Sequence, residues 1–522
     1  MLAGGLCAQE RDIDSLRERL GEIDAKLAGL ASFSLQTSVG PIGWRSGDHG
    51  DADHTEWVRI DLGAEQEIDL IALVPALARG GYNAYETDAF PLRFQIIAGT
   101  EHDVEGKVIA SFSEQDAVTP RIAPLCIPCP GTRASWIKLE ATRLGVRSWD
   151  GRYVLQLAEM MVFSGQENIA LGCPLKTSSD DNYNQGARQT PFLVDGALPY
   201  LMHSPGKKTT AYFTRLEEGT VANFTVDLGG VFPVNRLRMH SMDVSDTVPQ
   251  ANRANFAFPQ HLILEGALQP DFADARVLCE YVQKSMYDVS SIVQRRFTEL
   301  PCRYLRFSVP AADFVDSAEI DTRVDLLGFA ELEVFAGGRN VLAGCEISAD
   351  FDDSSAHNTP AFLTDGANAY GSIIDTRDWI EQLALRHDLE TERPQVQASL
   401  DGLFSEQEQQ FALLKNLSFL IGGALAIVIL LSHIIRLRQM SRLRQRLAAD
   451  LHDQVGANLH AIGLLSDIAR EEALMLAPTE EQAPLLSAVG EIRDTTERTA
   501  ASVRHCSDTL EPHSLHADFE ED

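Results

Sequence analysis

The chain has 522 residues, of which 44% are hydrophobic and 23% are charged, and its formal net charge is −32. This length suits about three or four domains, and the hydrophobic content excludes a largely disordered chain. The acidic excess excludes non-specific nucleic-acid binding, because a phosphate backbone would be repelled. Eight cysteines in a chain this long exclude a disulfide-dense scaffold.

Residues 1–32 have two parts. The first ten are apolar and small, and are similar to the tail of a secretory signal that lacks its charged start. From residue 11 to residue 30, apolar residues alternate spacings of three and four, which predicts a short heptad helix. Its apolar seam either pairs with a partner chain or packs on the following domain. The seam residues are Ile13, Leu16, Leu20, Ile23, Leu27 and Leu30.

Residues 33–337 show short alternating runs separated by Gly, Pro and Asp, which predicts an all-β region. Four landmarks recur in one order at an offset of 166 to 172 residues. We therefore predict two copies of one β-sandwich, at residues 33–165 and 166–337. The paired landmarks are Asp61-Leu62-Gly63 with Asp227-Leu228-Gly229, Phe90-Pro91 with Phe258-Pro259, Trp136 to Leu139 with Tyr304 to Phe307, and Ala158 to Phe163 with Ala330 to Phe335.

A third copy begins but does not complete its strands. Asn168 to Cys173 and Phe192 to Gly196 recur as Asn340 to Cys345 and Phe362 to Gly366. A polar helical stretch follows, which we expect to break at Pro394. Residues 338–415 are therefore predicted to be an incomplete third repeat and a helical stalk.

These repeats resemble the discoidin, or coagulation factor 5/8 type C, family of galactose-binding-like jelly rolls. The family opens with Asn-x-Ala-x-Gly, passes Asp-Gly and Asp-Leu-Gly, and closes on a Glu-containing strand; the first copy lacks the opening. The resemblance implies binding of an extracellular carbohydrate or lipid head group by loops at one end. It also implies a Ca²⁺ site with Asp195 and Glu331 as oxygen ligands. Alternatively, Asp195 supports a turn with Gly196 and Glu331 caps a strand edge.

One stretch predicts a membrane-spanning helix. Residues 416–436 include the run from Leu417 to Ile435, which contains no Asp, Glu, Lys or Arg. Arginines follow it, so the positive-inside rule places the C-terminal side in the cytoplasm and the N-terminal part outside. We expect a single-pass protein of the cell (inner) membrane. The arginines are Arg436, Arg438, Arg442, Arg444 and Arg446.

Residues 437–512 predict a helical hairpin. Each arm carries one apolar stripe, and the arms are separated by a break near residues 477–484. Two such hairpins from two chains would form a dimeric four-helix bundle, so we expect a homodimer. The first arm contains Asp450-Leu451-His452-Asp453-Gln454-Val455-Gly456.

His452 beside an acid suits phosphoryl transfer, because the ring nitrogen can act as nucleophile while a carboxylate supports the charge that develops. The segment from Arg442 to Pro512 resembles the dimerisation and phosphoacceptor domain of sensor histidine kinases, in the subgroup with an Asp-Leu-His-Asp-x-x-Gly box. The resemblance implies that His452 is the phosphoacceptor, that Asp453 is its acid/base partner, and that a response regulator is a partner.

Two features depart from that family. Ala457 stands where many members have a Gln associated with phosphatase activity. The acidic tail, residues 513–522, stands where the ATP-binding domain is expected. We therefore expect no cofactor bound by this chain itself, with ATP supplied through a separate ATP-binding kinase domain.

Two functions remain open on the sequence. The first is a membrane sensor of a two-component phosphorelay. The second is a membrane-anchored carbohydrate-binding or adhesion protein whose cytoplasmic bundle only dimerises. Cys126-Ile-Pro-Cys129 has redox-motif spacing, but it lacks the strand-then-helix setting of such motifs, which favours a local bridge or free thiols.

Overall fold

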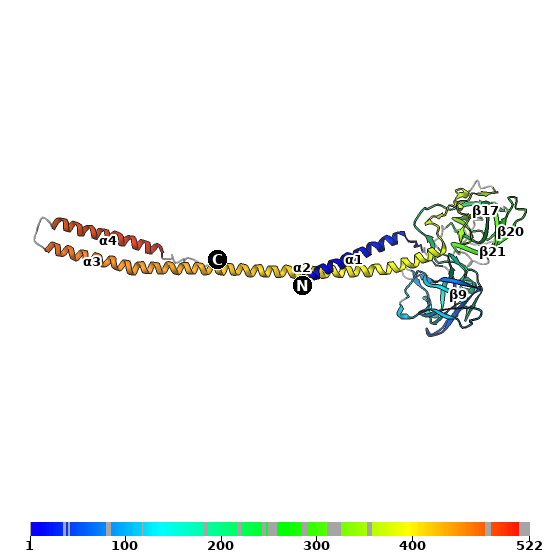
Figure 1. Ribbon diagram of the computed structural model, residues 1–522, viewed down its shortest axis with the longest axis horizontal. Coiled ribbons are helices and arrows are strands. Elements are labelled where there is room, and N and C mark those ends of the chain that lie inside the picture. The colour runs from blue at the N-terminus through cyan, green and yellow to red at the C-terminus, as the bar shows by residue number, and fades with distance from the viewer. Residues whose placement is uncertain are drawn as a thin grey trace. The chain divides into compact units, whose positions relative to one another are not determined.

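The computed structural model describes residues 2–34, 38–39, 42–79, 85–116, 118–181, 186–216, 221–242, 247–248, 258–283, 290–310, 325–351, 356, 358–475 and 482–510. These residues divide into two compact units, Met1–Asp401 and Gly402–Asp522. The first unit contains the strands and the second is helical (Figure 1).

The first β-sandwich, called sandwich 1, is built on two long antiparallel strands, β4 (Glu56–Pro75) and β9 (Leu125–Arg143). Their pairing shifts register twice, after Asp61 and after Ile68 of β4. Such irregularities bend strands, which lets the sheet enclose one core. The sheet order is β13-β12-β4-β9-β7-β8, and β3 and β14 join at β12 and β4. The other strands are β3 (Trp44–Arg45), β7 (Arg93–Gly99), β8 (Lys107–Phe112), β12 (Gln156–Ser164), β13 (Glu167–Asn168) and β14 (Leu175–Thr177).

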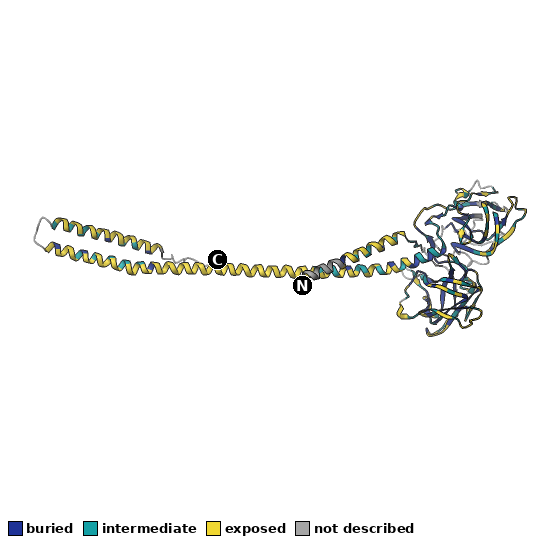
Figure 2. Cartoon of the chain, viewed as in Figure 1, coloured by how far each residue is buried: buried dark blue, intermediate teal, exposed yellow. Residues whose placement is uncertain are grey.

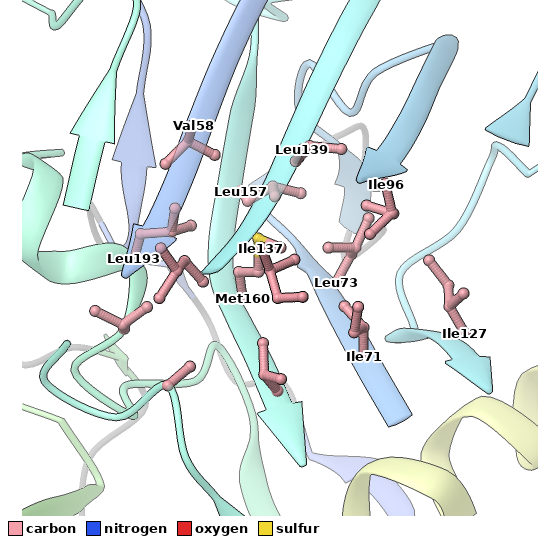
Figure 3. Close-up of a cluster of buried hydrophobic side chains, with 14 of the residues drawn as sticks. Val58, Ile71, Leu73, Ile96, Ile127, Ile137, Leu139, Leu157, Met160 and Leu193 are labelled. Carbon is pink, nitrogen blue, oxygen red and sulfur yellow. The ribbon is translucent and has the colours of Figure 1, made fainter. Parts of the chain in front are cut away.

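The core of sandwich 1 follows from the alternation in β4 and β9. Val58 and Ile60 point inward from β4 and meet Ile137 and Leu139 of β9, and all four are fully buried. Figure 3 shows Val58, Ile137 and Leu139 converging with Leu73 and other labelled side chains from neighbouring strands. Burying such side chains is the main term that stabilises the sandwich.

Sandwich 2 repeats this plan. Its sheet order, β20-β19-β21-β17-β23-β24, matches the order in sandwich 1 strand for strand, and β25 joins at β17. The predicted pair of β-sandwiches is confirmed. The strands are β17 (Ala222–His240), β19 (His261–Ala267), β20 (Arg276–Val282), β21 (Ile292–Val309), β23 (Glu331–Ala336), β24 (Arg339–Asn340) and β25 (Ile347–Ala349).

Short elements complete the first unit as strand pairs and 3-10 turns. The pairs are β1 (Ser32–Ser34) with β15 (Leu201–His203), β2 (Ser38–Val39) with β18 (Thr247–Val248), β5 (Leu77–Arg79) with β6 (Tyr85–Thr87), β10 (Gly145–Val146) with β11 (Tyr153–Val154), β16 (Tyr212–Leu216) with β22 (Asp325–Phe329), and β26 (Ala367–Asn368) with β27 (Gly371–Ser372). The turns are η1 (Glu114–Asp116), η2 (Thr190–Leu193) and η4 (Pro360–Leu363).

The Asn-Ile-Ala-Leu-Gly segment lies on the preceding sandwich, which differs from the predicted boundary at residue 166. Strand β14 pairs with β4, and Ile169 and Val194 belong to the core of sandwich 1. In the same way β25 pairs with β17, and Leu363 belongs to the core of sandwich 2. The predicted third repeat is therefore the closing segment of sandwich 2. This placement also explains why the first copy lacked an opening, since each sandwich carries that segment at its C-terminal end.

Helix α1 (Leu2–Gly29) packs antiparallel on the first part of α2 (Thr376–Asp450) (Figure 1). Ile13 and Ile23 on the predicted seam are buried, so the seam contacts the same chain. Arg386 donates to the carbonyls at the end of α1, and Arg393 pairs with Asp24. These contacts lie just before Pro394, where the predicted break is wrong: α2 continues through it. The contacts with α1 help to offset the backbone hydrogen bond that proline cannot donate.

Within the described part of the chain, one helix is long and apolar enough to cross a membrane, and it contains the predicted span from Leu417 to Ile435. The side chains of the span are exposed along its length (Figure 2). After α2 the chain forms a π-helical turn, η5 (Leu451–Gly456), then α3 (Ala457–Met475) and α4 (Gln482–Leu510). The predicted hairpin is confirmed, with α3 and α4 as its arms (Figure 1).

Candidate functional sites

His452 lies in the π-helical turn η5, where the sequence predicted an uninterrupted helix. Both His452 and Asp453 are exposed. A π turn inserts one residue into the helix and changes the direction of the side chains around it, and such turns occur frequently at functional sites. The turn therefore presents an accessible imidazole with a carboxylate as its neighbour in the chain, which is what phosphoryl transfer to histidine requires.

The hairpin closes through small and polar residues. Ser466 and Ala473 of α3, and Thr496 and Ser507 of α4, are its buried positions. Ser507 donates to the carbonyl of Ala448 over 3.2 Å. Arg493 of α4 also pairs with Asp467 of α3. The side chains that the two arms bury most deeply are therefore small or polar.

Several large apolar side chains of the hairpin, and of the end of α2 that leads into it, remain on the surface of the single chain. They include Leu443, Leu447, Ile462, Leu465 and Ile492. A stripe of exposed leucine and isoleucine along a helical hairpin indicates an interaction surface. The exposure agrees with the expectation that the hairpin pairs with a second copy.

The sandwiches each contain one buried glutamate beside an Asp-Gly turn. In sandwich 1 the carboxylate Oε1 of Glu159 accepts a 2.9 Å hydrogen bond from the backbone N–H of Gly196. Burial, reinforced by the nearby Asp195 carboxylate, raises the pKa of Glu159 well above its ordinary value. Its second oxygen, Oε2, is buried with no hydrogen-bond partner among the described residues.

Sandwich 2 repeats the arrangement with Glu331 and Asp365. The Oε1 atom of Glu331 accepts a 3.0 Å hydrogen bond from the backbone N–H of Gly366. Burial is the main cause that raises the pKa of Glu331 to about 9, and the negative charges of Glu333 and Asp365 add to it. Its Oε2 likewise has no hydrogen-bond partner within the described part of the chain.

The predicted cation ligands Asp195 and Glu331 are not brought together as one pair. Asp195 lies beside Glu159, and Glu331 lies beside Asp365, because each Asp-Gly turn packs on the preceding sandwich. The corrected pairs each offer a buried carboxylate oxygen that lacks a donor. Carboxylate oxygens are the ligands that Ca²⁺ prefers, so both pairs fit such a cation. The sequence missed Glu159 and Asp365 because the repeat was divided at the wrong residue.

An exposed tryptophan, Trp149, marks one loop of sandwich 1, between β10 and β11. Its side chain is 60% exposed, and the Arg147 guanidinium lies 4.5 Å from the ring centroid. Arg147 also pairs with Asp150, which lowers the pKa of that carboxyl to about 2. The backbone N–H of Ser148 donates to Asp88. The loop therefore holds a flat aromatic surface in a fixed position, a feature that sequence analysis did not identify.

The Cys126 and Cys129 thiols are unsuited to redox chemistry. Both lie on strand β9 and both are free. Burial raises the pKa of Cys126 to about 12 and that of Cys129 to about 11. A reactive cysteine needs the thiolate form, which these surroundings disfavour. Of the two alternatives that the sequence left open, a local bridge or free thiols, the structure has free thiols.

Residues 444–515 match the family model described as Histidine kinase. The C-terminal hairpin is similar to the histidine kinases. This confirms the predicted resemblance for the segment that carries His452. Histidine-kinase hairpins of this kind generally dimerise and interact with response regulators. The exposed apolar side chains on α2 and α3, the helices on either side of η5, are in keeping with dimerisation.

Comparison with curated protein sequences gave no match. Among solved structures, a fucolectin from the serum of striped bass (Morone saxatilis) is 14% identical, covers 60% of this chain and 97% of its own, and has a TM-score of 0.17. Two CBM32 domains of ZmpB from Clostridium perfringens are 10% identical, with coverages of 55% and 85% and a TM-score of 0.18. With TM-scores this low, the assignment of the sandwiches rests on the strand pairings described above.

Proposed function

We propose that this chain is a membrane sensor of a two-component phosphorelay, single-pass in the cell membrane, with its sandwiches outside and its hairpin in the cytoplasm. His452 accepts a phosphoryl group from the ATP held by a histidine-kinase ATP-binding domain, and passes it to an aspartate of a response regulator. Asp453 accepts the ring proton and supports the charge that develops on the imidazole. The chain acts as a homodimer.

The observation that carries this proposal is the exposed His452 on a π-helical turn inside the segment that matches the histidine-kinase family. The apolar span and the arginines that follow it support the membrane orientation. The apolar stripe on the hairpin supports the dimer, since a four-helix bundle of two hairpins would bury it.

Phosphotransfer tests the proposal directly. The full chain in lipid nanodiscs is mixed with separate histidine-kinase ATP-binding domains and labelled ATP. We expect acid-labile label on the wild type and none on His452→Gln. His460→Gln is the matched control, because His460 is also exposed on the same arm of the hairpin and should keep the label.

Other outcomes distinguish the alternative function. Label that survives in His452→Gln, or no label with several kinase domains, would contradict the assignment of His452. Dimers without label would favour the membrane-anchored binding or adhesion protein, whose bundle only dimerises.

The ligand proposed for sandwich 1 is an extracellular carbohydrate, bound at Trp149. The exposed indole offers an apolar face for a sugar ring, and Arg147 beside it offers hydrogen-bond donors for hydroxyl groups. On a glycan array, Trp149→Ala should lose signal that the wild type shows. Phe272→Ala is the control, because Arg306 stacks on Phe272 at 4.6 Å in sandwich 2. Equal binding by wild type and Trp149→Ala would contradict this site, and lipid head groups would then be tested with vesicles.

Ca²⁺ is the cation proposed for the buried acid pairs, with Glu159 and Asp195 holding one ion and Glu331 and Asp365 a second. When bound, it supplies positive charge to two carboxylates that otherwise lie in low-dielectric surroundings. The buried oxygens without a donor support this proposal. Removal of Ca²⁺ by a chelator should lower the melting temperature of the wild type, while Glu331→Gln should respond less.

A further inference from the structure

Two histidines and a glutamate converge at one end of sandwich 1, outside the sites described above. His49 and His54 come from the loop before β4, and Glu56 is the first residue of β4. The two imidazole rings stack with centroids 3.6 Å apart and an angle of 20°. Nε2 of His49 lies 2.7 Å from Oε1 of Glu56. One ligand atom from each of the three side chains lies within 4.8 Å of the others.

The carboxylate of Glu56 is held in place before any ligand arrives. Glu56 is only 2% exposed. The hydroxyl of Ser179 donates to Oε1 over 2.8 Å, and the hydroxyl of Ser178 donates to Oε2. These serines follow β14, on the segment that packs on β4, so they orient the carboxylate from a second part of the chain. Such partners, which orient a metal-binding side chain, are typical of metal sites in proteins.

The loop that carries the histidines is also anchored. Asp48 pairs with Arg152 at 2.7 Å, and Asp53 pairs with Arg143 at 3.0 Å. His49 forms a backbone bridge with Tyr153. His49 is half-buried and His54 is exposed, so one imidazole is fixed while the other can rotate.

Sandwich 2 shows that the fold does not need this cluster. Ala222 begins β17 as Glu56 begins β4, and each lies opposite the equivalent position of the next strand, Val309 and Ala141. At the same sequence offset, Arg215 and Thr220 stand in place of His49 and His54. Buried Ala222 occupies the same strand position in sandwich 2, so packing alone does not explain why Glu56 is buried in sandwich 1.

We propose that His49, His54 and Glu56 bind a divalent transition-metal ion of the Zn²⁺ type. Two imidazole nitrogens and one carboxylate oxygen form a common zinc donor set, and three protein ligands leave one position open to water or a further ligand. Binding displaces the proton shared by His49 and Glu56. Metal–ligand distances of about 2.0–2.2 Å place the ligand atoms roughly 3.3 Å apart, which rotation of exposed His54 can reach. Nitrogen donors distinguish this site from the Ca²⁺ pairs, which offer oxygen alone.

Zinc content of the full chain tests the site. The untagged protein in nanodiscs is stripped with a chelator, dialysed against Zn²⁺ with excess Ca²⁺, and analysed by elemental mass spectrometry. We expect His54→Ala and Glu56→Gln each to lower bound zinc by about one ion per chain, because three ligands are needed to hold the ion. His261→Ala is the matched control: His261 pairs with Glu280 at 2.8 Å on sandwich 2, and no third ligand joins this pair among the described residues.

Thermal unfolding keeps the test falsifiable if Glu56→Gln folds poorly. His54 is exposed, so His54→Ala should melt like the wild type without metal, and Zn²⁺ should raise the melting temperature of the wild type alone. Equal zinc in wild type and His54→Ala would overturn the proposal, as would an equal loss in His261→Ala or displacement of the zinc by Ca²⁺. The result does not depend on phosphotransfer to His452.

Discussion

The two sandwiches share one strand order but differ where they meet the start of helix α2. In sandwich 1, Ala72 of β4 lies opposite Met161 of β12. In sandwich 2 the equivalent pair is Arg238 of β17 and Glu333 of β23. One copy thus contributes an apolar surface, and the other contributes a buried ion pair.

The ion pair of sandwich 2 belongs to a network that includes the first residue of α2. Nη2 of Arg238 donates to Glu333 over 2.9 Å, and Nη1 donates to the hydroxyl of Thr376 over 2.9 Å. His240 lies 2.8 Å from the same carboxylate. Burial works against the charge on Glu333, but Arg238 and His240 outweigh it and lower its pKa to about 2. Sandwich 1 instead contributes Met161 and neighbouring residues to an apolar cluster with Trp379 of α2.

Both copies therefore kept the same sheet, while their contacts with α2 diverged. Apolar surfaces pack in several registers at similar free energy, whereas a bidentate ion pair with a hydroxyl partner fits one geometry. We therefore expect sandwich 1 to contribute buried apolar area to the contact with α2. We expect sandwich 2 to define the residue at which α2 begins.

The largest effect should come from breaking the ion pair in sandwich 2. Glu333→Gln leaves the buried Arg238 without a carboxylate, which should lower the free energy of unfolding by about 3–5 kcal/mol. Calorimetric melting of the full chain, with hydrogen exchange in β17 and β23 to locate the change, measures it.

A variant of sandwich 2 that carries the equivalent residues of sandwich 1 provides the control. The double variant Arg238→Ala with Glu333→Met removes both charges, so it should cost much less than Glu333→Gln. It should, however, loosen hydrogen exchange at the first turn of α2, because Thr376 loses its donor. Equal destabilisation by the single and double variants would contradict the role given to the buried charge.

A smaller effect per pH unit should come from the buried glutamate that each sandwich places beside its Asp-Gly turn, Glu159 in sandwich 1 and Glu331 in sandwich 2. In the absence of Ca²⁺, Glu331 is protonated in the folded protein up to about pH 9 but ionises near 4.5 when unfolded. A raised pKa gives stability that is complete below pH 4.5 and is lost as pH rises toward 9. Each pH unit in this window costs about 1.4 kcal/mol, and Glu331→Gln should remove that slope.

Unfolding measured at several pH values with a chelator present checks this prediction. Glu159→Gln in sandwich 1 should change the slope in the same direction, since burial raises the pKa of Glu159 as well. Added Ca²⁺ should reduce the slope of the wild type, because a cation favours the ionised carboxylates. A wild type whose stability is flat from pH 5 to 9 would rule out a protonated Glu331.

Much of this architecture could be predicted from the sequence, because repeats, apolar runs and heptad stripes report directly on burial. The two sandwiches, the apolar span and the hairpin all follow from such patterns. The structure differs from the predicted boundary at residue 166, because a sequence motif does not show which sheet its segment joins. Here β14 pairs with β4 of the preceding copy.

The candidate sites were predictable only in part. His452 could be found because its neighbours in the chain define the motif. Glu159 with the Asp195-Gly196 turn, and Glu56 with Ser179, are separated by long stretches of sequence and meet only in the folded sandwich. The π turn at His452 was also missed, since it changes backbone hydrogen bonding without changing the apolar stripe.

The smallest effect should come from the contact of α1 with α2. Arg386 is largely buried and donates to the carbonyls of Leu27, Leu30 and Ala31, at and just beyond the C-terminal end of α1. Arg386→Ala should therefore cost about 1 kcal/mol, the low end of the penalty for carbonyls that lose a donor, because these carbonyls are only partly buried.

Arg393→Ala is its matched control, because Arg393 lies on the same helix and pairs with Asp24 on the exposed surface. An exposed pair is screened by water and salt, so this variant should melt like the wild type. Hydrogen exchange along α1 compares the two directly. If Arg393→Ala loosened α1 as much as Arg386→Ala, charge pairing rather than capping of the α1 carbonyls would hold the two helices together.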